Sequence, residues 1–383
     1  MDTDKVIMEL EFEKSNGNTS YLTHNFHSYP AKFIPQIPKS IIKALTKEEE
    51  IVLDPFCGCG TTLVEAKLLN RNAIGIDINP IATLVTRAKT TKLSQEEIQF
   101  TTTLLTNIEK DIGNYYNRRI AIDYKIPDFN NRDHWFQQNV LNELGIIKFH
   151  IDNLKNEKLK TYLYAVLSSI IVTVSNQESD TRFAAVDKRI TNFRTFSEFS
   201  KKLKDMNTRM SEFSRVAPDS SVRVYNTDAQ NMSFLKNNTV DLIVTSPPYA
   251  NTYDYYLYHK FRMYWLGYDV RMVQASEIGS RNRYSSKRED ISTFKENLLQ
   301  CFREMRRVLK NNKYAVIVIG DSVISGKLIR TNELIQEIAA KNGFFFVREI
   351  SYSLKENSKM FNPKFASSGK LEYIMFFKNR KEE

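Results

Sequence analysis

The feature that most constrains the fold is a short β-forming run at residues 51–53, which leads directly into a glycine-rich turn and a helical pattern. The turn contains Gly58 and Gly60, and the helical pattern occupies residues 61–70. A second β-forming run follows and ends at Asp77. A strand, a tight turn and a helix that lead to another strand form the repeating unit of a parallel sheet covered by helices. The sequence therefore predicts an α/β fold with a ligand at the carboxyl edge of its sheet.

The same alternation returns in the second half of the chain. β-forming runs at 240–245 and 314–319 flank a long amphipathic helical pattern at 290–309. Two final β-forming runs, at 344–354 and 371–378, are separated by a polar link, which predicts an antiparallel strand pair at the end of the sheet.

Composition limits the partners and the compartment. A net charge of +10 and a pI near 9.2 favour contact with a phosphate backbone, so nucleic acid is the leading partner. A disulfide between Cys57 and Cys59 would be strained, so we expect reduced thiols and a cytoplasmic protein. Five histidines without a Cys/His cluster at ligand spacing predict no metal. The first residues lack a basic and apolar leader, and the apolar runs are short, so we expect no membrane anchor.

The glycine-rich turn is the first candidate binding site, and it reads Asp54-Pro55-Phe56-Cys57-Gly58-Cys59-Gly60-Thr61-Thr62. Glycines let a ligand approach the backbone, and free amides at a helix start can receive an anionic group. A Gly-x-Gly turn alone is equally compatible with a purely structural connection. Asp77 at the next strand end favours a nucleoside, because an acid there accepts hydrogen bonds from ribose hydroxyls. The whole turn resembles the cofactor loop of DNA amino-methyltransferases, which bind S-adenosylmethionine.

This resemblance implies roles for the matched residues. Asp54 would face the methionine ammonium group, Phe56 would lie against the cofactor, and glycines of the turn would admit it. Residues 27–33 resemble the other cofactor segment of the family. Asp228 would hold the adenine amino group, with a helix cap as the structural alternative. The expected cofactor-binding residues are Tyr29, Pro30, Ala31, Lys32, Phe33, Asp54, Pro55, Phe56, Cys57, Gly58, Gly60, Thr61, Thr62, Asp77, Ile78, Asp228 and Ala229.

The second candidate site is Ser246-Pro247-Pro248-Tyr249, which follows the β-forming run 240–245 and so shares the sheet edge of the turn. A Pro-Pro pair can also simply end a strand. An exocyclic amino nitrogen is a poor nucleophile until acceptors bind both of its hydrogens. The Ser246 side chain and the Pro247 carbonyl supply two acceptors, and the prolines hold them in place. Tyr249 offers a ring on which an extruded base can stack, so we expect these four residues to be catalytic.

The resemblance implies a site-specific DNA methyltransferase that converts S-adenosylmethionine to S-adenosylhomocysteine by direct in-line transfer. In the resembled family, serine before Pro-Pro-Tyr is commoner in cytosine-N4 enzymes, so cytosine N4 is favoured over adenine N6. An RNA amino-methyltransferase and a non-enzymatic DNA-binding scaffold remain as alternatives. The expected partners are double-stranded DNA with an extruded base and the restriction endonuclease of a restriction-modification system.

Two segments after the tetrapeptide are candidates for DNA contact. One is rich in aromatic residues at helical spacing, which predicts a helix around residues 255–266; bases can stack on such residues, although they also build cores. The other, residues 280–288, is basic and resembles a mobile loop that grips phosphates, with a solvated loop as the alternative. The expected DNA-binding residues are Tyr253, Arg281, Arg283, Lys287 and Arg288.

The resemblance also implies a Rossmann-like seven-stranded methyltransferase sheet with a C-terminal antiparallel strand pair. Residues 1–91 would hold the lead-in and the cofactor-binding half, with a loosely packed stretch at 1–28. Residues 92–220 show helical periodicity and would be a mostly helical insertion with a possible role in target recognition. Residues 221–383 would form the catalytic half.

Overall fold

The computed structural model describes residues 3–10, 18–118, 124–285, 290–324, 327–353 and 370–380. Its main sheet contains seven strands. These are β1 (Ile51–Asp54), β2 (Asn72–Asp77), β5 (Val222–Asn226), β6 (Val240–Thr245), β7 (Leu309–Gly320), β10 (Phe344–Ser353) and β11 (Leu371–Asn379). Two small hairpins lie outside it and are formed by β3 (Gln177–Ser179) with β4 (Arg182–Ala185), and by β8 (Ser322–Ile324) with β9 (Lys327–Ile329).

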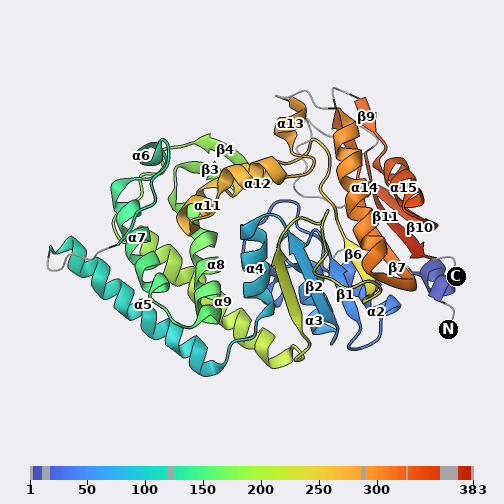
Figure 1. The fold of residues 1–383 in the computed structure, drawn as a ribbon. Coiled ribbons are helices and arrows are strands. Elements are labelled where there is room, and N and C mark those ends of the chain that lie inside the picture. The colour runs from blue at the N-terminus through green and yellow to red at the C-terminus, as the bar shows by residue number, and fades with distance from the viewer. Residues whose placement is uncertain are drawn as a thin grey trace.

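The strand order is β10-β11-β7-β6-β1-β2-β5 (Figure 1). The five strands β7, β6, β1, β2 and β5 run parallel to one another, whereas β11 lies antiparallel to both β7 and β10. The predicted α/β Rossmann-like sheet with a C-terminal antiparallel pair is therefore confirmed.

Helices cover both faces of the sheet and build a separate helical part. They are α1 (Thr3–Glu9), α2 (Gln36–Leu45), α3 (Thr61–Leu68), α4 (Pro80–Thr90), α5 (Gln95–Tyr116), α6 (Arg132–Trp135), α7 (Gln138–Asp152), α8 (Glu157–Val174), α9 (Arg194–Val216), α10 (Tyr255–Tyr258), α11 (Lys260–Leu266), α12 (Val270–Ser276), α13 (Arg281–Ser285), α14 (Ile291–Val308) and α15 (Thr331–Lys341). A short 3₁₀ helix spans Leu22–Asn25. None of the helices described is both long enough and apolar enough to cross a bilayer.

The local sequence explains where several helices begin. Asn79 caps α4 by accepting a hydrogen bond from the Ile81 amide, and Pro80 stands at the first helical position. Ser94 and Glu97 form a capping box at the start of α5. These caps satisfy amides that have no partner inside the helix.

Alternate side chains of each strand enter different cores, as the two-residue period of a strand requires. Leu53, Ile243 and Ile317 pack in one cluster with residues of α14 and α15. Their neighbours on the opposite face of the sheet pack in another cluster with residues of α1, α2 and α3. The carboxyl ends of the parallel strands are thereby held at one edge between two helical layers.

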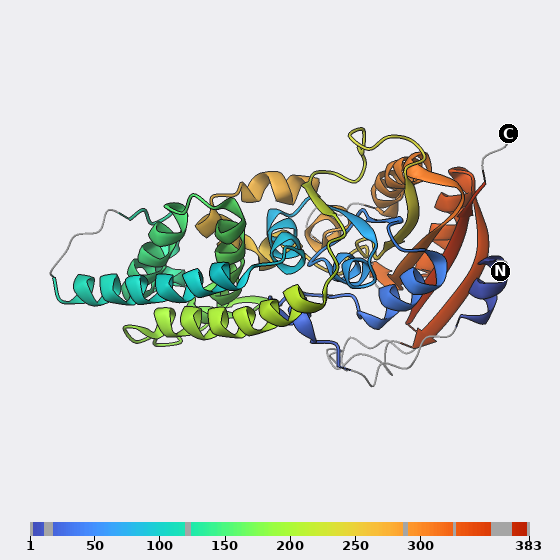
Figure 2. The same cartoon turned by 90° about the horizontal axis from the view of Figure 1, so that it is seen from below.

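The predicted mostly helical insertion is also confirmed. Helices α5, α7, α8 and α9 share one large apolar core, to which α11 contributes Phe261 and Trp265. Figure 2 shows α5 (cyan) and α9 (yellow-green) running side by side away from the sheet. The insertion therefore packs on the catalytic half through α4 and α11.

The structure corrects several local predictions. The insertion contains the β3–β4 hairpin, although no β-forming run was predicted there. The aromatic segment after the tetrapeptide forms two helices, α10 and α11, which meet at His259 (φ −101°, ψ 5°) instead of one continuous helix. Arg281–Ser285 is a short helix and not the predicted loop.

The prediction of a loosely packed stretch at residues 1–28 is wrong for its last part. Phe26 and His27 are buried, and His24 is completely buried with its Nε2 2.6 Å from Glu65 Oε1. Glu65 lies on α3, so this stretch is fixed by tertiary contacts with the cofactor-turn helix.

Candidate active site

A cavity of about 1360 Å³ lies at the carboxyl ends of the parallel strands, between the sheet and the helical insertion. Gly58 of the turn after β1 and Ser246 of the loop after β6 both line it. The lining includes these predicted site residues: Tyr29, Ala31, Lys32, Phe33, Asp54, Pro55, Phe56, Cys57, Gly58, Thr61, Thr62, Asp77, Ile78, Asp228, Ala229, Ser246, Pro247, Pro248, Tyr249 and Tyr253. Pro30 and Gly60 are not part of the lining.

The turn after β1 is held by hydrogen bonds to its own backbone and to β2. The Cys57 amide donates to the Ile76 carbonyl at 2.9 Å, and the Gly60 amide donates to the Cys57 carbonyl at 2.7 Å. Gly60 has φ +79°, and a Cβ there would lie 2.6 Å from Thr86 Cγ2. Gly60 is therefore required by its backbone conformation and by close packing on α4, not by direct exposure to the cavity.

Two carboxylates lie at the strand ends beside this turn. Asp77 accepts hydrogen bonds from the amides of Gly58 (2.9 Å) and Asn79 (2.8 Å). Asp54 accepts from the Phe56 amide (3.1 Å) and from the Thr245 hydroxyl (2.6 Å). Burial raises the pKa of each carboxyl to about 6. Neither carboxylate forms an ion pair with any described residue, so the cavity carries acid groups without a cationic partner.

The hydrogen bond from Thr245 to Asp54 joins the two predicted motifs. Thr245 is the last residue of β6 and directly precedes the tetrapeptide, whereas Asp54 is the last residue of β1 and begins the glycine-rich turn. Because this contact is buried, the relative position of the two loops is fixed by the ends of two neighbouring strands.

Asp228 follows β5 and shapes its own turn. Its carboxylate oxygens accept hydrogen bonds from the Gln230 amide (2.8 Å) and from the Gln230 side chain (3.0 Å). Asp228 also lines the cavity.

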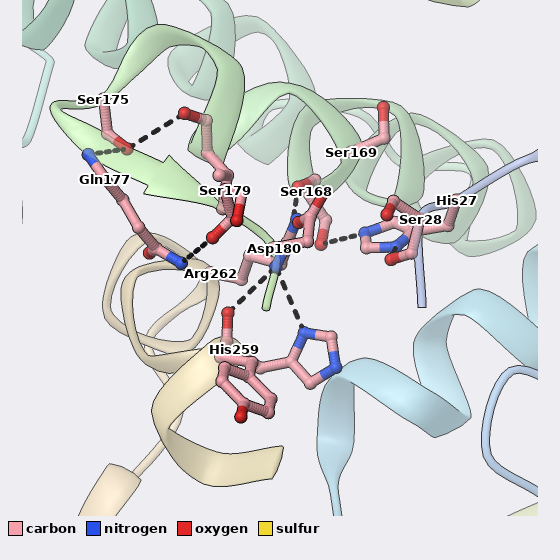
Figure 3. Close-up of polar contacts among 12 residues, drawn as sticks. His27, Ser28, Ser168, Ser169, Ser175, Gln177, Ser179, Asp180, His259 and Arg262 are labelled. Atoms are coloured by element: carbon pink, nitrogen blue, oxygen red, sulfur yellow. Dashed lines mark hydrogen bonds and ion pairs between the residues drawn. The ribbon is translucent and has the colours of Figure 1, made fainter. Parts of the chain in front are cut away.

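The wall facing the insertion contains a polar cluster that sequence analysis did not identify (Figure 3). Its centre is Arg262, whose side chain is 1% exposed and forms an ion pair with Asp180 in the turn between β3 and β4. The guanidinium also donates to the carbonyls of Ser168 (2.9 Å) and Tyr258 (3.0 Å). His27 Nε2 lies 3.0 Å from the Ser168 hydroxyl. The cluster thus joins the N-terminal segment, the insertion and α11.

The electrostatics of this cluster follow from burial. Burial lowers the pKa of His27 and His259 well below the usual range, and the Arg262 charge lowers both further. For Asp180, burial raises the pKa, but the charge and hydrogen bond of Arg262 outweigh it, so the net pKa is lowered. The cluster therefore holds one ionised Arg–Asp pair beside two neutral imidazoles.

A second acid that sequence analysis missed is Glu277, which lines the cavity and accepts hydrogen bonds from the amides of Tyr255 (2.7 Å) and Tyr256 (3.2 Å). Burial raises its pKa to about 8. Nothing in the local sequence around Glu277 distinguishes it from a surface glutamate, because its burial depends on α10 packing against the segment after α12.

The candidate DNA-contacting residues are distributed unevenly. Tyr253 lines the cavity, and its ring lies 5.5 Å from that of Tyr255. Arg281 and Arg283 belong to α13 and do not line the cavity. Lys287 and Arg288 lie outside the described residues.

The part of the chain that the structure describes contains no group of three or more His, Cys, Asp or Glu side chains placed to hold a metal ion.

Comparison with known proteins connects this geometry to a family. The family model described as DNA methylase matches residues 5–85 and 240–383, which contain both loops of the cavity. Type II methyltransferase M.MvaI of Kocuria varians is 28% identical over 280 residues, which cover 69% of this chain and 61% of that protein. Type II methyltransferase M.MjaII of Methanocaldococcus jannaschii is 24% identical over 414 aligned positions, which cover 85% of this chain and 75% of that protein.

A shorter match occurs to a protein with an RNA substrate in its name. The tRNA (guanine(10)-N2)-dimethyltransferase of Methanocaldococcus jannaschii is 41% identical over 63 residues, which cover 16% of this chain and 17% of that protein.

Proposed function

The chain belongs to the DNA methylase family, and on that premise we propose that it is an S-adenosylmethionine-dependent DNA methyltransferase that acts on an exocyclic amino group. The observation that carries the proposal is the meeting of two loops in one cavity. Gly58 and Ser246 line the same space, and the Thr245–Asp54 hydrogen bond of 2.6 Å ties their strands together.

The residues of the cavity fit the proposed cofactor. S-adenosylmethionine, when bound, supplies a methyl group on a positively charged sulfur. Asp54 is buried and Asp77 is half-buried, neither has a cationic partner among the described residues, and a cation in the cavity would favour their ionised forms. Asp54 would face the methionine ammonium group, Asp77 the ribose hydroxyls and Asp228 the adenine amino group. Gly58 has φ +48°, a conformation that favours glycine, and it lines the cavity without a side chain, so a ligand can approach its backbone.

The tetrapeptide would prepare the amine. The Ser246 hydroxyl and the Pro247 carbonyl would accept its two hydrogens, which draws the nitrogen lone pair out of conjugation with the ring. The base would stack on Tyr249 after leaving the duplex. Alignment and exclusion of water would then account for most of the rate, since direct displacement needs no strong base.

We favour N4 of cytosine as the acceptor because serine precedes Pro-Pro-Tyr, and N6 of adenine is the alternative. Double-stranded DNA is the proposed substrate, and a restriction endonuclease of the same system is the proposed biological counterpart. The two long matches are both named Type II methyltransferases, which supports a DNA methyltransferase. The match to M.MvaI covers 61% of the length of that protein.

An RNA amino-methyltransferase is the second candidate, and the short match to the tRNA enzyme favours it. That match covers 16% of the chain, whereas the match to M.MjaII covers 85%. The DNA substrate therefore has the broader support.

The test is to incubate the protein with radiolabelled S-adenosylmethionine and either unmethylated duplex DNA or total tRNA, digest the products and separate the nucleosides. Label in N4-methylcytosine supports the full proposal. Label in N6-methyladenine would correct the base, and label confined to tRNA would correct the substrate. Absence of transfer to either nucleic acid would refute the activity.

A further inference from the structure

The ring of Tyr249 is held by groups outside its own loop. Its hydroxyl donates a hydrogen bond to Glu372 Oε1 at 2.8 Å. Glu372 lies on β11, directly opposite Gly320 of β7 in the strand register. A Cβ at Gly320 would lie 3.0 Å from Tyr249 Cε2. Any residue larger than glycine at position 320 would therefore crowd the tyrosine ring. The antiparallel strand therefore reaches the proposed catalytic loop.

Glu372 is placed to act on the ring and not only to stabilise the sheet. It lines the cavity together with Ser246 and Tyr249. It forms no ion pair with the residues that the structure describes, and the hydroxyls of Tyr249 and Tyr352 both interact with its carboxylate. Hydrogen bonds to a charged acceptor are shorter and stronger than those between neutral groups.

We infer that Glu372 is a positioning residue that orients the Tyr249 ring for stacking of the target base, with Gly320 leaving the space that the ring needs. This inference rests on the proposed function, because the base and its transfer belong to that proposal. A ring that is free to rotate would still permit binding of the cofactor but would align the base poorly.

The kinetic test compares variants with the wild-type protein on unmethylated plasmid DNA. Glu372→Ala should lower kcat by about 10- to 100-fold, because a hydrogen bond to a charged group contributes roughly that factor. KM for S-adenosylmethionine should stay within about twofold, since Glu372 does not act on the cofactor residues. Glu372→Gln keeps an oxygen acceptor and should retain most of the activity.

Two further variants separate positioning from general stability. Gly320→Ala should lower kcat in the same way, because its Cβ would displace the ring. Tyr249→Phe should lower kcat, and Glu372→Ala added to it should change kcat by less than about twofold, since the two side chains act as one unit. Glu349→Ala is the matched control, because this β10 glutamate contacts Asn332 and Gln336 away from the cavity.

A readout that does not depend on activity is ¹⁹F NMR of protein labelled with 3-fluorotyrosine, with the Tyr249 signal assigned from Tyr249→Phe. Glu372→Ala should shift or broaden this signal, whereas Glu372→Gln and Glu349→Ala should leave it near its wild-type position. An unchanged signal with unchanged kcat in Glu372→Ala would overturn the inference. Absence of methyl transfer by the wild-type protein would instead refute the proposed function, and the NMR result would still decide whether Glu372 holds the ring.

Discussion

Asp180→Asn provides a test of how the insertion is fixed to the catalytic half. Asp180 is the only carboxylate in ion-pair contact with Arg262 among the described residues, and Arg262 is 1% exposed. Asparagine keeps a hydrogen-bond acceptor but removes the negative charge, which leaves a buried guanidinium without a counter-charge. Breaking a buried pair costs about 3–5 kcal/mol. Because 28% of the Asp180 side chain is exposed, we expect the lower end, about 3 kcal/mol.

The assay is equilibrium unfolding in urea, followed by tryptophan fluorescence. The two tryptophans report on this region, because Trp265 is buried on α11 and Trp135 lies 4.9 Å from Phe261 of the same helix. Adding Arg262→Met to Asp180→Asn should recover at least about 1 kcal/mol, because it removes the uncompensated charge.

The control is Asp187→Asn, which affects an exposed pair with Arg189 at 3.8 Å and should change the free energy of unfolding by less than about 0.5 kcal/mol. A loss below about 1 kcal/mol for Asp180→Asn, or no recovery in the double variant, would refute the assignment of a buried charge pair at this junction.

Four other predictions concern the cavity and its turn. The affinity for S-adenosylmethionine should rise about tenfold per carboxylate between pH 5 and pH 7, because the pKa values of Asp54 and Asp77 are raised to about 6 and a cation binds their ionised forms. Titration calorimetry measures this dependence of affinity on pH, and the dependence should be weaker in Asp77→Asn. Because the pKa values of these two carboxyls are higher in the folded protein than in the unfolded chain, the free energy of unfolding of the unliganded protein should fall as the pH rises from about 4 to about 6. Urea unfolding at several pH values measures this. Gly60→Ala should cost about 2 kcal/mol or more in thermal unfolding, whereas Gly113→Ala, which meets no atom within 4 Å, should be neutral or stabilising. Pro248→Ala should lower kcat far more than cofactor affinity, and equal losses in both would contradict its assigned role.

The sheet and its two loops could be predicted because their signals are local. Each loop directly follows a β-forming run, which ends at Asp54 in one case and just before Ser246 in the other. The carboxyl ends of parallel strands lie at one edge of a sheet, so the two loops could be expected to lie close together. The β3–β4 hairpin was missed because its strands have three and four residues, too few to show alternation. The break between α10 and α11 was missed because aromatic periodicity continues across His259.

The contacts that complete the site were not predictable from local sequence. Asp180 and Arg262 are 82 residues apart, and Tyr249 and Glu372 are 123 residues apart. Burial of His24 depends on Glu65 of a different helix. Such pairs are set by how elements pack, which a pattern within one element does not contain.

We propose that the cofactor and the amine meet between the glycine-rich turn and the tetrapeptide. A crystal structure with S-adenosylhomocysteine bound tests it most directly. We expect the adenosine beside Asp77 and Asp228, with the sulfur between Gly58 and Ser246. A ligand bound outside this cavity, or with its sulfur turned away from Ser246, would refute this arrangement.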